Sequence, residues 1–217
     1  MPKVNRKGQA EVLSQDQLTQ LWTELRPPHR LITQLAYYTA SRISEVCALR
    51  VEDISAGKVV IRQSKTERTK EVVIVSPLQD AISNTTLPTT GYLFPAAKWT
   101  RATVKRYRIQ RHKTGGQRFE LVGELPPRQH ISSRAVDKAL RKTCDGLGIQ
   151  GVSTHTFRRS LATHLYDAGV PLRQIMEITG HASLASLTCY LNLEQRAAEN
   201  ALLNFFARKD GKQATKN

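Results

Sequence analysis

The sequence lacks features that would each define a class of protein. It contains no apolar run of the roughly 18 to 20 residues that a membrane-spanning helix needs. Its first residues are basic with no apolar stretch behind them, so we expect no secretory signal. The three cysteines, Cys47, Cys144 and Cys189, form no CxxC pair. We therefore expect free thiols in the reducing cytoplasm and no zinc site.

Acidic residues are scarce relative to basic ones. The 217 residues include 33 Lys and Arg against 18 Asp and Glu, which gives a formal net charge of +15. Because 40% of the residues are apolar, the composition is that of a folded protein with a core. So large a positive charge opposes compaction and indicates a polyanionic partner, with nucleic acid ahead of an anionic membrane surface.

Apolar residues recur at helical spacing near both ends of the sequence. Ser14 is placed to cap a first helix, with Gln17 as its capping-box partner, and Pro27 and Pro28 end that helix. We expect further helices over residues 31–39, 43–49, 78–83, 135–147, 154–168, 171–179, 184–191 and 194–207.

The period of the apolar residues changes after the expected helix at 43–49. Residues 58–63 (KVVIRQ) and 71–76 (EVVIVS) are β-branched runs that flank a polar connection, which predicts an antiparallel hairpin. The sequence therefore predicts an α+β domain that is mainly helical and carries a small antiparallel sheet. We expect this domain to span 13–207, between a flexible basic leader, 1–12, and a polar tail, 208–217.

Positive charge is concentrated in residues 98–118. This stretch contains eight basic residues and no acidic one, interleaved with Trp99 and Tyr107. Such a run is often only a solvated face, but aromatic interleaving favours a surface that follows nucleic-acid phosphates. The residues to which we assign this contact are Arg101, Lys105, Arg106, Arg108, Arg111 and Lys113.

Two arginines occupy positions where an anion is a natural partner. His155 and Arg158 begin a predicted helix, and their spacing puts both on one face near the positive end of the helix dipole. Arg42 also begins a helix, a poor place for a cation without a carboxylate or phosphate partner, and Glu45 lies one turn on. A packed histidine in a basic first turn and a structural salt bridge are the alternatives.

A histidine and a tyrosine follow at a short spacing near the end of the sequence. Gly180 permits a sharp turn after a predicted helix, His181 comes next, and Tyr190 lies nine residues later on the following helix. Taken singly, such a tyrosine is more often a core residue, and such a histidine a satisfied polar group. Their order and spacing relative to the two arginines make the combination more specific.

The succession TASRISEV, a lysine on a hairpin loop, HTFRRSLATHL and TGHASLASLTCY resembles the catalytic domain of the tyrosine recombinases, the phage-integrase family of site-specific DNA recombinases. The resemblance extends from about Leu13 to Phe206, and residues 98–129 match poorly, as a basic insertion. The layout is similar to that of short members with a catalytic domain only, such as the recombinases of fimbrial switches, or to a truncated longer protein.

The resemblance implies a role for each position of the pattern. A tyrosine would attack the scissile phosphate to form a 3′-phosphotyrosyl bond, arginines would clamp the phosphate, and histidines would serve as base and hydrogen-bond donor. A hairpin lysine would protonate the leaving 5′-hydroxyl, and an acidic residue would support the first arginine. The residues in these roles would be Tyr190, Arg42, Arg158, His155, His181, Lys65 and Glu45.

Some positions depart from the family pattern or leave a choice. Lys70 shares the hairpin connection with Lys65 and is the alternative catalytic lysine. Ala40 stands where a glycine is usual and Arg159 where a second histidine is usual, and we expect both to be peripheral to the chemistry.

The resemblance implies a DNA strand transferase that integrates, excises or inverts DNA without metal, ATP or another cofactor. The expected partner is double-stranded DNA, on which the protein would assemble as a dimer to tetramer, with no membrane contact, in the cytoplasm at the nucleoid. The helix 194–207 would dock on a neighbouring subunit or pack on its own core. Type IB topoisomerase-like relaxation and a non-catalytic DNA-binding regulator on the same fold are the alternatives.

Overall fold

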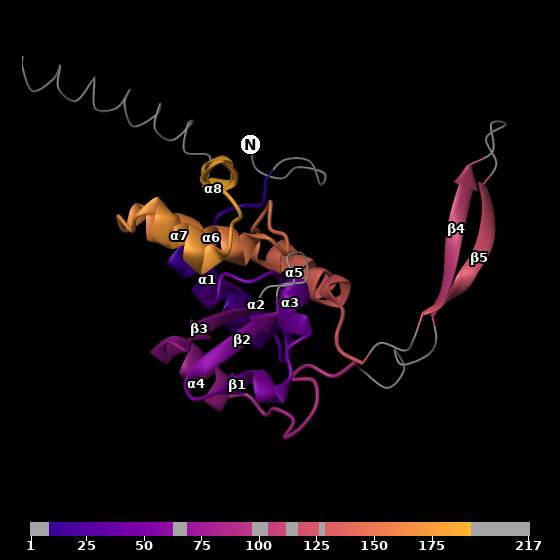
Figure 1. The fold of residues 1–217 in the computed structure, drawn as a ribbon, viewed down its shortest axis with the longest axis horizontal. Coiled ribbons are helices and arrows are strands. Elements are labelled where there is room, and N and C mark those ends of the chain that lie inside the picture. The colour runs from indigo at the N-terminus through magenta and orange to yellow at the C-terminus, as the bar shows by residue number, and fades with distance from the viewer. Residues whose placement is uncertain (1–8, 63–68, 97–103, 112–116, 126–128, 192–217) are drawn as a thin grey trace, which may run out of the picture.

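The computed structural model of the protein describes residues 9–62, 69–96, 104–111, 117–125 and 129–191; for 104–111 and 117–125 it describes the backbone. Figure 1 shows a helical body with a small sheet on one side. The helices are α1 (Gln15–Glu24), α2 (His29–Tyr38), α3 (Ile43–Cys47), α4 (Ser76–Ser83), α5 (Ser133–Leu147), α6 (Thr156–Asp167), α7 (Leu172–Thr179) and α8 (Leu184–Leu191). None of the helices in these ranges is long and apolar enough to cross a membrane.

The predicted sheet and hairpin are confirmed. β1 (Ile54–Ser55), β2 (Lys58–Arg62) and β3 (Thr69–Val73) form an antiparallel sheet in that order, with Val59 opposite Val72. The two-residue strand β1 was not predicted, because so short a run carries no periodicity of its own. The fold is therefore mainly helical with a small antiparallel sheet, as the sequence predicted.

The ends of α1 and α7 lie where the local sequence signals predict them. Ser14 caps α1 and forms the expected capping box with Gln17. α7 ends at Gly180, whose φ of 67° lies in the left-handed region that glycine adopts without steric cost. The predicted helix at residues 154–168 begins two residues later, so that His155 is its N-cap residue instead of lying within it.

The core consists of a large cluster and a small one. The large cluster packs α1, α2, α3, α5 and the sheet together through residues such as Leu18, Leu35 and Phe157, which are fully buried. The small cluster joins α6, α7 and α8 through Ala162, Ile175, Leu187 and Leu191. Because Phe157 and Ala162 both lie on α6, this helix connects the two clusters.

A second antiparallel pair of strands was not predicted. β4 (Val104–Arg111) and β5 (Gln117–Leu125) form a two-stranded ribbon that stands away from the helical body in Figure 1. The alternation of Tyr107 and Ile109 with charged residues and the Gly115-Gly116 turn signal before β5 are typical of a hairpin, but the dense positive charge of this segment favours a solvated face as strongly.

The N-terminal residues 9–12 differ from the flexible leader that we expected. The backbone N–H of Glu11 donates to Gly151 O at 3.0 Å, and the Gln9 amide Nε2 donates to Cys189 O at 3.3 Å. Ala10 is buried, and Leu13, which follows this segment, is fully buried. This short segment is therefore tied to both α8 and the residues that precede α6.

Candidate active site

Arg42 is held at the start of α3 by Glu45. The Glu45 carboxylate accepts from the Arg42 backbone N–H at 2.9 Å and from the guanidinium Nη1 at 2.7 Å. The Glu45 side chain is only 1% exposed and that of Arg42 29% exposed. The buried Glu45 carboxylate thus holds both the backbone and the guanidinium of Arg42, and the Arg42 side chain stays partly accessible. The structure therefore places Glu45 where it can support Arg42.

Arg158 binds the backbone just before Arg42. It is 3% exposed, and its Nη1 donates to Ala40 O at 2.9 Å. Burial lowers the pKa of Arg158, and the nearby Arg42 guanidinium lowers it further, whereas Tyr190 and Glu45 raise it. Two guanidinium groups therefore share one site, and an anion bound between them would offset their repulsion.

The backbone angle at Ala40 explains why a glycine is usual at this position. The φ of Ala40 is 49°, in the left-handed region that residues with a Cβ rarely adopt. The turn brings the carbonyl oxygens of Thr39 and Ala40 toward the site, where Lys70 and Arg158 bind them. The departure from the family pattern therefore preserves the backbone turn, although at a residue less suited to it than glycine.

His181 follows α7 and is oriented by Thr179. The Thr179 hydroxyl lies 2.6 Å from His181 Nδ1 and 2.6 Å from Ile175 O. Burial lowers the pKa of His181 to about 4, and Arg158, Arg42 and Lys70 contribute to the shift. The imidazole is therefore neutral at pH 7. The sequence assigned no role to Thr179, although it lies two residues before His181 in the same motif.

Tyr190 lies close enough to Arg158, Arg159 and Arg42 to interact with their charges. Its ring packs at 4.9 Å, between centroids, from that of His181. Burial raises the pKa of the phenol, and the positive charges of Arg158, Arg159 and Arg42 oppose that rise. Arg159 was expected to be peripheral to the chemistry. It lines the same pocket as Tyr190, however, and is close enough to lower the pKa of the phenol.

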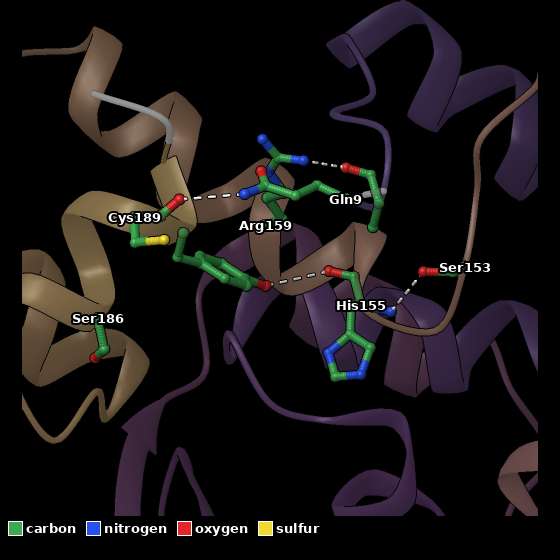
Figure 2. Close-up of a pocket in the computed structure, with 8 residues that line it drawn as sticks. Gln9, Ser153, His155, Arg159, Ser186 and Cys189 are labelled. Atoms are coloured by element: carbon green, nitrogen blue, oxygen red, sulfur yellow. Dashed lines mark hydrogen bonds between the residues drawn. The ribbon is translucent and has the colours of Figure 1, made fainter. Parts of the chain in front are cut away.

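The pocket beside Tyr190 is shown in Figure 2. It has a volume of about 330 Å³ and is lined by Gln9, Ala10, Ser153, His155, Arg159, Ser186, Cys189 and Tyr190. The N-terminal segment closes one side, because Gln9 binds Cys189 O and Arg159 Nη1 donates to Ala10 O at 2.5 Å. The Tyr190 hydroxyl donates to the backbone oxygen of His155 at 3.3 Å (Figure 2).

His155 contacts Tyr190 with its backbone carbonyl oxygen in this structure. Its carbonyl oxygen accepts the Tyr190 hydroxyl, while the residue as a whole is exposed. A carbonyl oxygen can hold the phenolic proton but cannot remove it at pH 7. The expected role of the His155 imidazole as a base thus stays a prediction.

Of the two candidate catalytic lysines, Lys65 and Lys70, the structure describes Lys70, which lies on β3. Its Nζ donates to Thr39 O at 2.5 Å and to Ile178 O at 2.6 Å. Burial lowers the pKa of Lys70 to about 8, with Arg158 and Arg42 lowering it and Glu45 raising it. Lys65 lies outside the described residues.

Other predicted site residues are placed only in part. Arg101 and Lys113 lie outside the described residues, as does the predicted helix 194–207, and the backbone of Lys105, Arg106, Arg108 and Arg111 forms β4. Within the described ranges no three His, Cys, Asp or Glu side chains gather as they would to hold a metal ion. The expectation that the chemistry needs no metal or other cofactor therefore rests on the resemblance.

The fold and this arrangement of side chains define a class of protein. The structure is similar to the crystal structure of XerA recombinase, with a TM-score of 0.61 at 19% identity over 92% of this chain and 66% of that one. It is also similar to the catalytic domain of bacteriophage HP1 integrase, with a TM-score of 0.55 at 19% identity over 90% of this chain and 98% of that one. The fold is thus that of tyrosine recombinase catalytic domains.

Sequence comparison identifies the family. Residues 11–196 match the Phage integrase family, and the chain belongs to it. The chain is 28% identical to the tyrosine recombinase XerA of Pyrococcus furiosus, over 80% of this chain and 53% of that protein. It is 29% identical to the tyrosine recombinase XerC of Syntrophus aciditrophicus, over 74% of this chain and 47% of that protein. The chain thus spans about half the length of these relatives.

Proposed function

We propose that this protein is a site-specific DNA recombinase that cuts and rejoins DNA strands through a covalent 3′-phosphotyrosyl intermediate. The observation that carries the proposal is the meeting of Arg42, Arg158 and His181 around Tyr190, from four separate segments of the chain. Cations and a neutral imidazole around one phenol suit an anionic electrophile, and a phosphodiester is the one that the family uses. The names of the relatives support the same reaction.

The proposed cleavage step forms one bond and breaks another. Tyr190 Oη attacks the scissile phosphorus, the phenolic proton is lost, and the bond from phosphorus to the 5′ oxygen breaks as that oxygen gains a proton. Charge builds on the non-bridging oxygens, where the planar forks of Arg42 and Arg158 stabilise it. Rejoining reverses these steps with a new 5′-hydroxyl, so the bond energy is conserved and no ATP is needed.

Electrostatics govern the activation of the nucleophile. A phenol has a pKa of about 10 and is protonated at pH 7. In the DNA-free protein burial raises the pKa of Tyr190 further, while Arg158, Arg159 and Arg42 lower it. The proton must therefore pass to a base as attack proceeds, and the His155 imidazole, expected in that role, lies on the residue whose carbonyl already binds the hydroxyl.

The neutral imidazole of His181 can donate a hydrogen bond to a phosphate oxygen. The single proton of the Thr179 hydroxyl can serve Ile175 O or His181 Nδ1. When it serves Nδ1, the neutral imidazole carries its own proton on Nε2, and that N–H is the group that can donate to a phosphate oxygen. Thr179 thus positions His181, and the acceptor that takes the hydroxyl proton sets the tautomer of the imidazole.

A covalent-trapping assay tests the proposed function. A pool of nicked duplexes with randomised sequence around the nick would be incubated with the full chain and EDTA, and adducts that survive SDS would be isolated and sequenced. We expect an adduct at a preferred sequence that is lost in Tyr190→Phe while DNA binding is retained. Binding without any adduct would instead support the DNA-binding regulator, and adducts with plasmid relaxation but no strand exchange would support a topoisomerase.

The proposal extends to how the protein binds DNA and how its subunits assemble. Relatives of similar fold include a lambda integrase dimer bound to a core DNA site. We infer that this chain binds duplex DNA through the basic residues of segment 98–118 and assembles on it as a dimer to tetramer, with the helix predicted from the sequence at 194–207 as the docking element. On this proposal it acts on the DNA of the nucleoid. Sedimentation of the chain with its selected DNA would give the stoichiometry, and truncation after residue 193 should abolish assembly.

A further inference from the structure

Lys70 lies where two segments of the candidate active site meet. Thr39 follows α2 and precedes Arg42 by three residues, and Ile178 lies in the last turn of α7 and precedes His181 by three residues. The Lys70 ammonium on β3 donates to the carbonyl oxygens of both, at 2.5 Å and 2.6 Å. One side chain therefore bridges the segments that carry Arg42 and His181.

The segment that carries Arg42 needs such support. Ala40 has a φ of 49°, a conformation that an alanine keeps only when its surroundings impose it. Arg158 binds the Ala40 carbonyl and Lys70 binds the carbonyl just before it. Two cations from different elements thus hold successive peptide groups of the turn from which Arg42 projects.

The charge of Lys70 is maintained at neutral pH. Burial and the neighbouring arginines lower its pKa to about 8, with Glu45 acting in the opposite sense. At pH 7 the group is still mostly an ammonium with three N–H donors, of which two are directed at carbonyl oxygens. A group held in this way serves the geometry of the backbone, whereas a general acid must aim its proton at the leaving oxygen.

We propose that Lys70 is a positioning residue of strand cleavage, and that its bridge between Thr39 O and Ile178 O sets the separation at which Arg42 and His181 contact one phosphate. The leaving-group proton then comes from another donor, for which the resemblance implies Lys65. The catalytic consequence rests on the proposed function, but the bridge itself does not.

Hydrogen exchange on the DNA-free chain tests the bridge. In Lys70→Met, which keeps the length of the stem and removes the donors, we expect the amides of residues 39–43 and 178–182 to exchange about 10-fold faster. The amides of α1 and α5 should keep their wild-type rates. Lys58→Met is the matched control, because Lys58 is an exposed lysine of the same hairpin that pairs with Glu71. Wild-type exchange in either segment of Lys70→Met would refute the bridge.

A substrate with a better leaving group separates positioning from acid catalysis. Sulfur would replace the 5′ bridging oxygen at the cleavage position that the wild-type chain selects. A thiol has a pKa of about 8.5 and departs without a donated proton. We expect Lys70→Met to form adduct about 100-fold more slowly than wild type on both the oxygen and the sulfur substrate, because misplaced groups cost rate whatever leaves.

The outcomes distinguish this inference from the proposed function. Recovery of Lys70→Met on the sulfur substrate would make Lys70 the general acid and overturn its positioning role. Absence of adduct with wild-type chain would refute the proposed function, while the exchange result would still decide the bridge. If Lys70→Met fails to fold, Lys70→Gln, whose amide can keep one of the contacts, is measured in its place, with faster exchange expected in at least one segment.

Discussion

At the scale of single residues, the site depends on groups whose ionisation is controlled by burial. His181 shows this most clearly, because desolvation and the adjacent cations lower its pKa to about 4. An imidazole in an unfolded chain has a pKa of about 6.5. The folded protein therefore binds fewer protons at His181 than the unfolded chain does between these two values, and folding is coupled to pH in that window.

This coupling gives a prediction for stability. Because the folded-state pKa is depressed, the contribution of His181 is fully present above pH 6.5 and is lost as the pH falls toward 4. We expect the melting temperature of wild type to fall over this range, and His181→Asn to show a shallower fall in thermal melts recorded at half-unit steps. Parallel curves for the two proteins would contradict the pKa assigned to His181.

The hydroxyl of Thr179 gives a prediction for activity. Thr179→Val keeps the shape and removes the partner of His181 Nδ1, so adduct formation should slow about 10-fold, less than the roughly 100-fold expected when the donor is removed in His181→Ala. DNA affinity should not change. Thr143→Val is the control, because this threonine also bonds a carbonyl four residues earlier, on α5. An unchanged rate in Thr179→Val would rule out tautomer control.

At the scale of elements, the β4–β5 ribbon redistributes the charge that the sequence concentrates in residues 98–118. The register sets Glu124 opposite Lys105 and Glu120 opposite Arg108. Arg106 instead stands opposite Gly123, and Arg111 opposite Gln117. Arg118, on β5, stands opposite Gln110, so the arginines without a cross-strand glutamate are Arg106, Arg111 and Arg118, a distribution that only the pairing of the strands reveals.

The register leads to a prediction for DNA binding. Replacing Arg106 and Arg111 by Ala should lower the slope of log affinity against log salt by about 1.8, since each phosphate contact contributes about 0.9. The paired control, Lys105 and Arg108 to Ala, should lower it less, because cross-strand glutamates oppose those cations. Titrations between low and moderate salt measure both, and equal slopes for the two double variants would remove the special role of Arg106 and Arg111.

At the scale of the whole molecule, Tyr190, the proposed nucleophile, packs against the smaller of the two core clusters. α8, which carries Tyr190, is packed among the described residues through Leu187 and Leu191, whereas α2 lies within the large cluster. The N-terminal segment adds the contact from Gln9 to Cys189 O. The region around Tyr190 is therefore expected to open locally at a lower free energy than the rest of the fold.

A pair of core truncations tests this uneven stability. Leu35→Ala should lower the free energy of unfolding by about 2 to 5 kcal/mol, because a fully buried leucine leaves a cavity. Leu187→Ala should lower it less but should increase hydrogen exchange across α8. Urea unfolding and hydrogen exchange measure the two effects, and a larger global loss in Leu187→Ala would show that the small cluster is integral to the main core.

Much of the site could be predicted because its members lie in short segments with local signals. Arg42 and Glu45 share one turn, and the sequence spacing alone indicated their pairing, which the structure has. The positions of Lys70 and Arg159 could not be predicted in this way. Their partners, Ile178 and Ala10, lie 108 and 149 residues away, so nothing in the local sequence relates them.

The sequence by itself determined the class of fold and the family, and it predicted residues for the candidate site, because helical periodicity, caps and short motifs are local properties of the chain. Tertiary structure alone decided which cations surround Tyr190, how the turn at Ala40 is held, and where the charge of the basic segment remains unopposed. The physical reason is that burial, pKa shifts and strand register arise from contacts between distant segments, which exist only once the chain has folded.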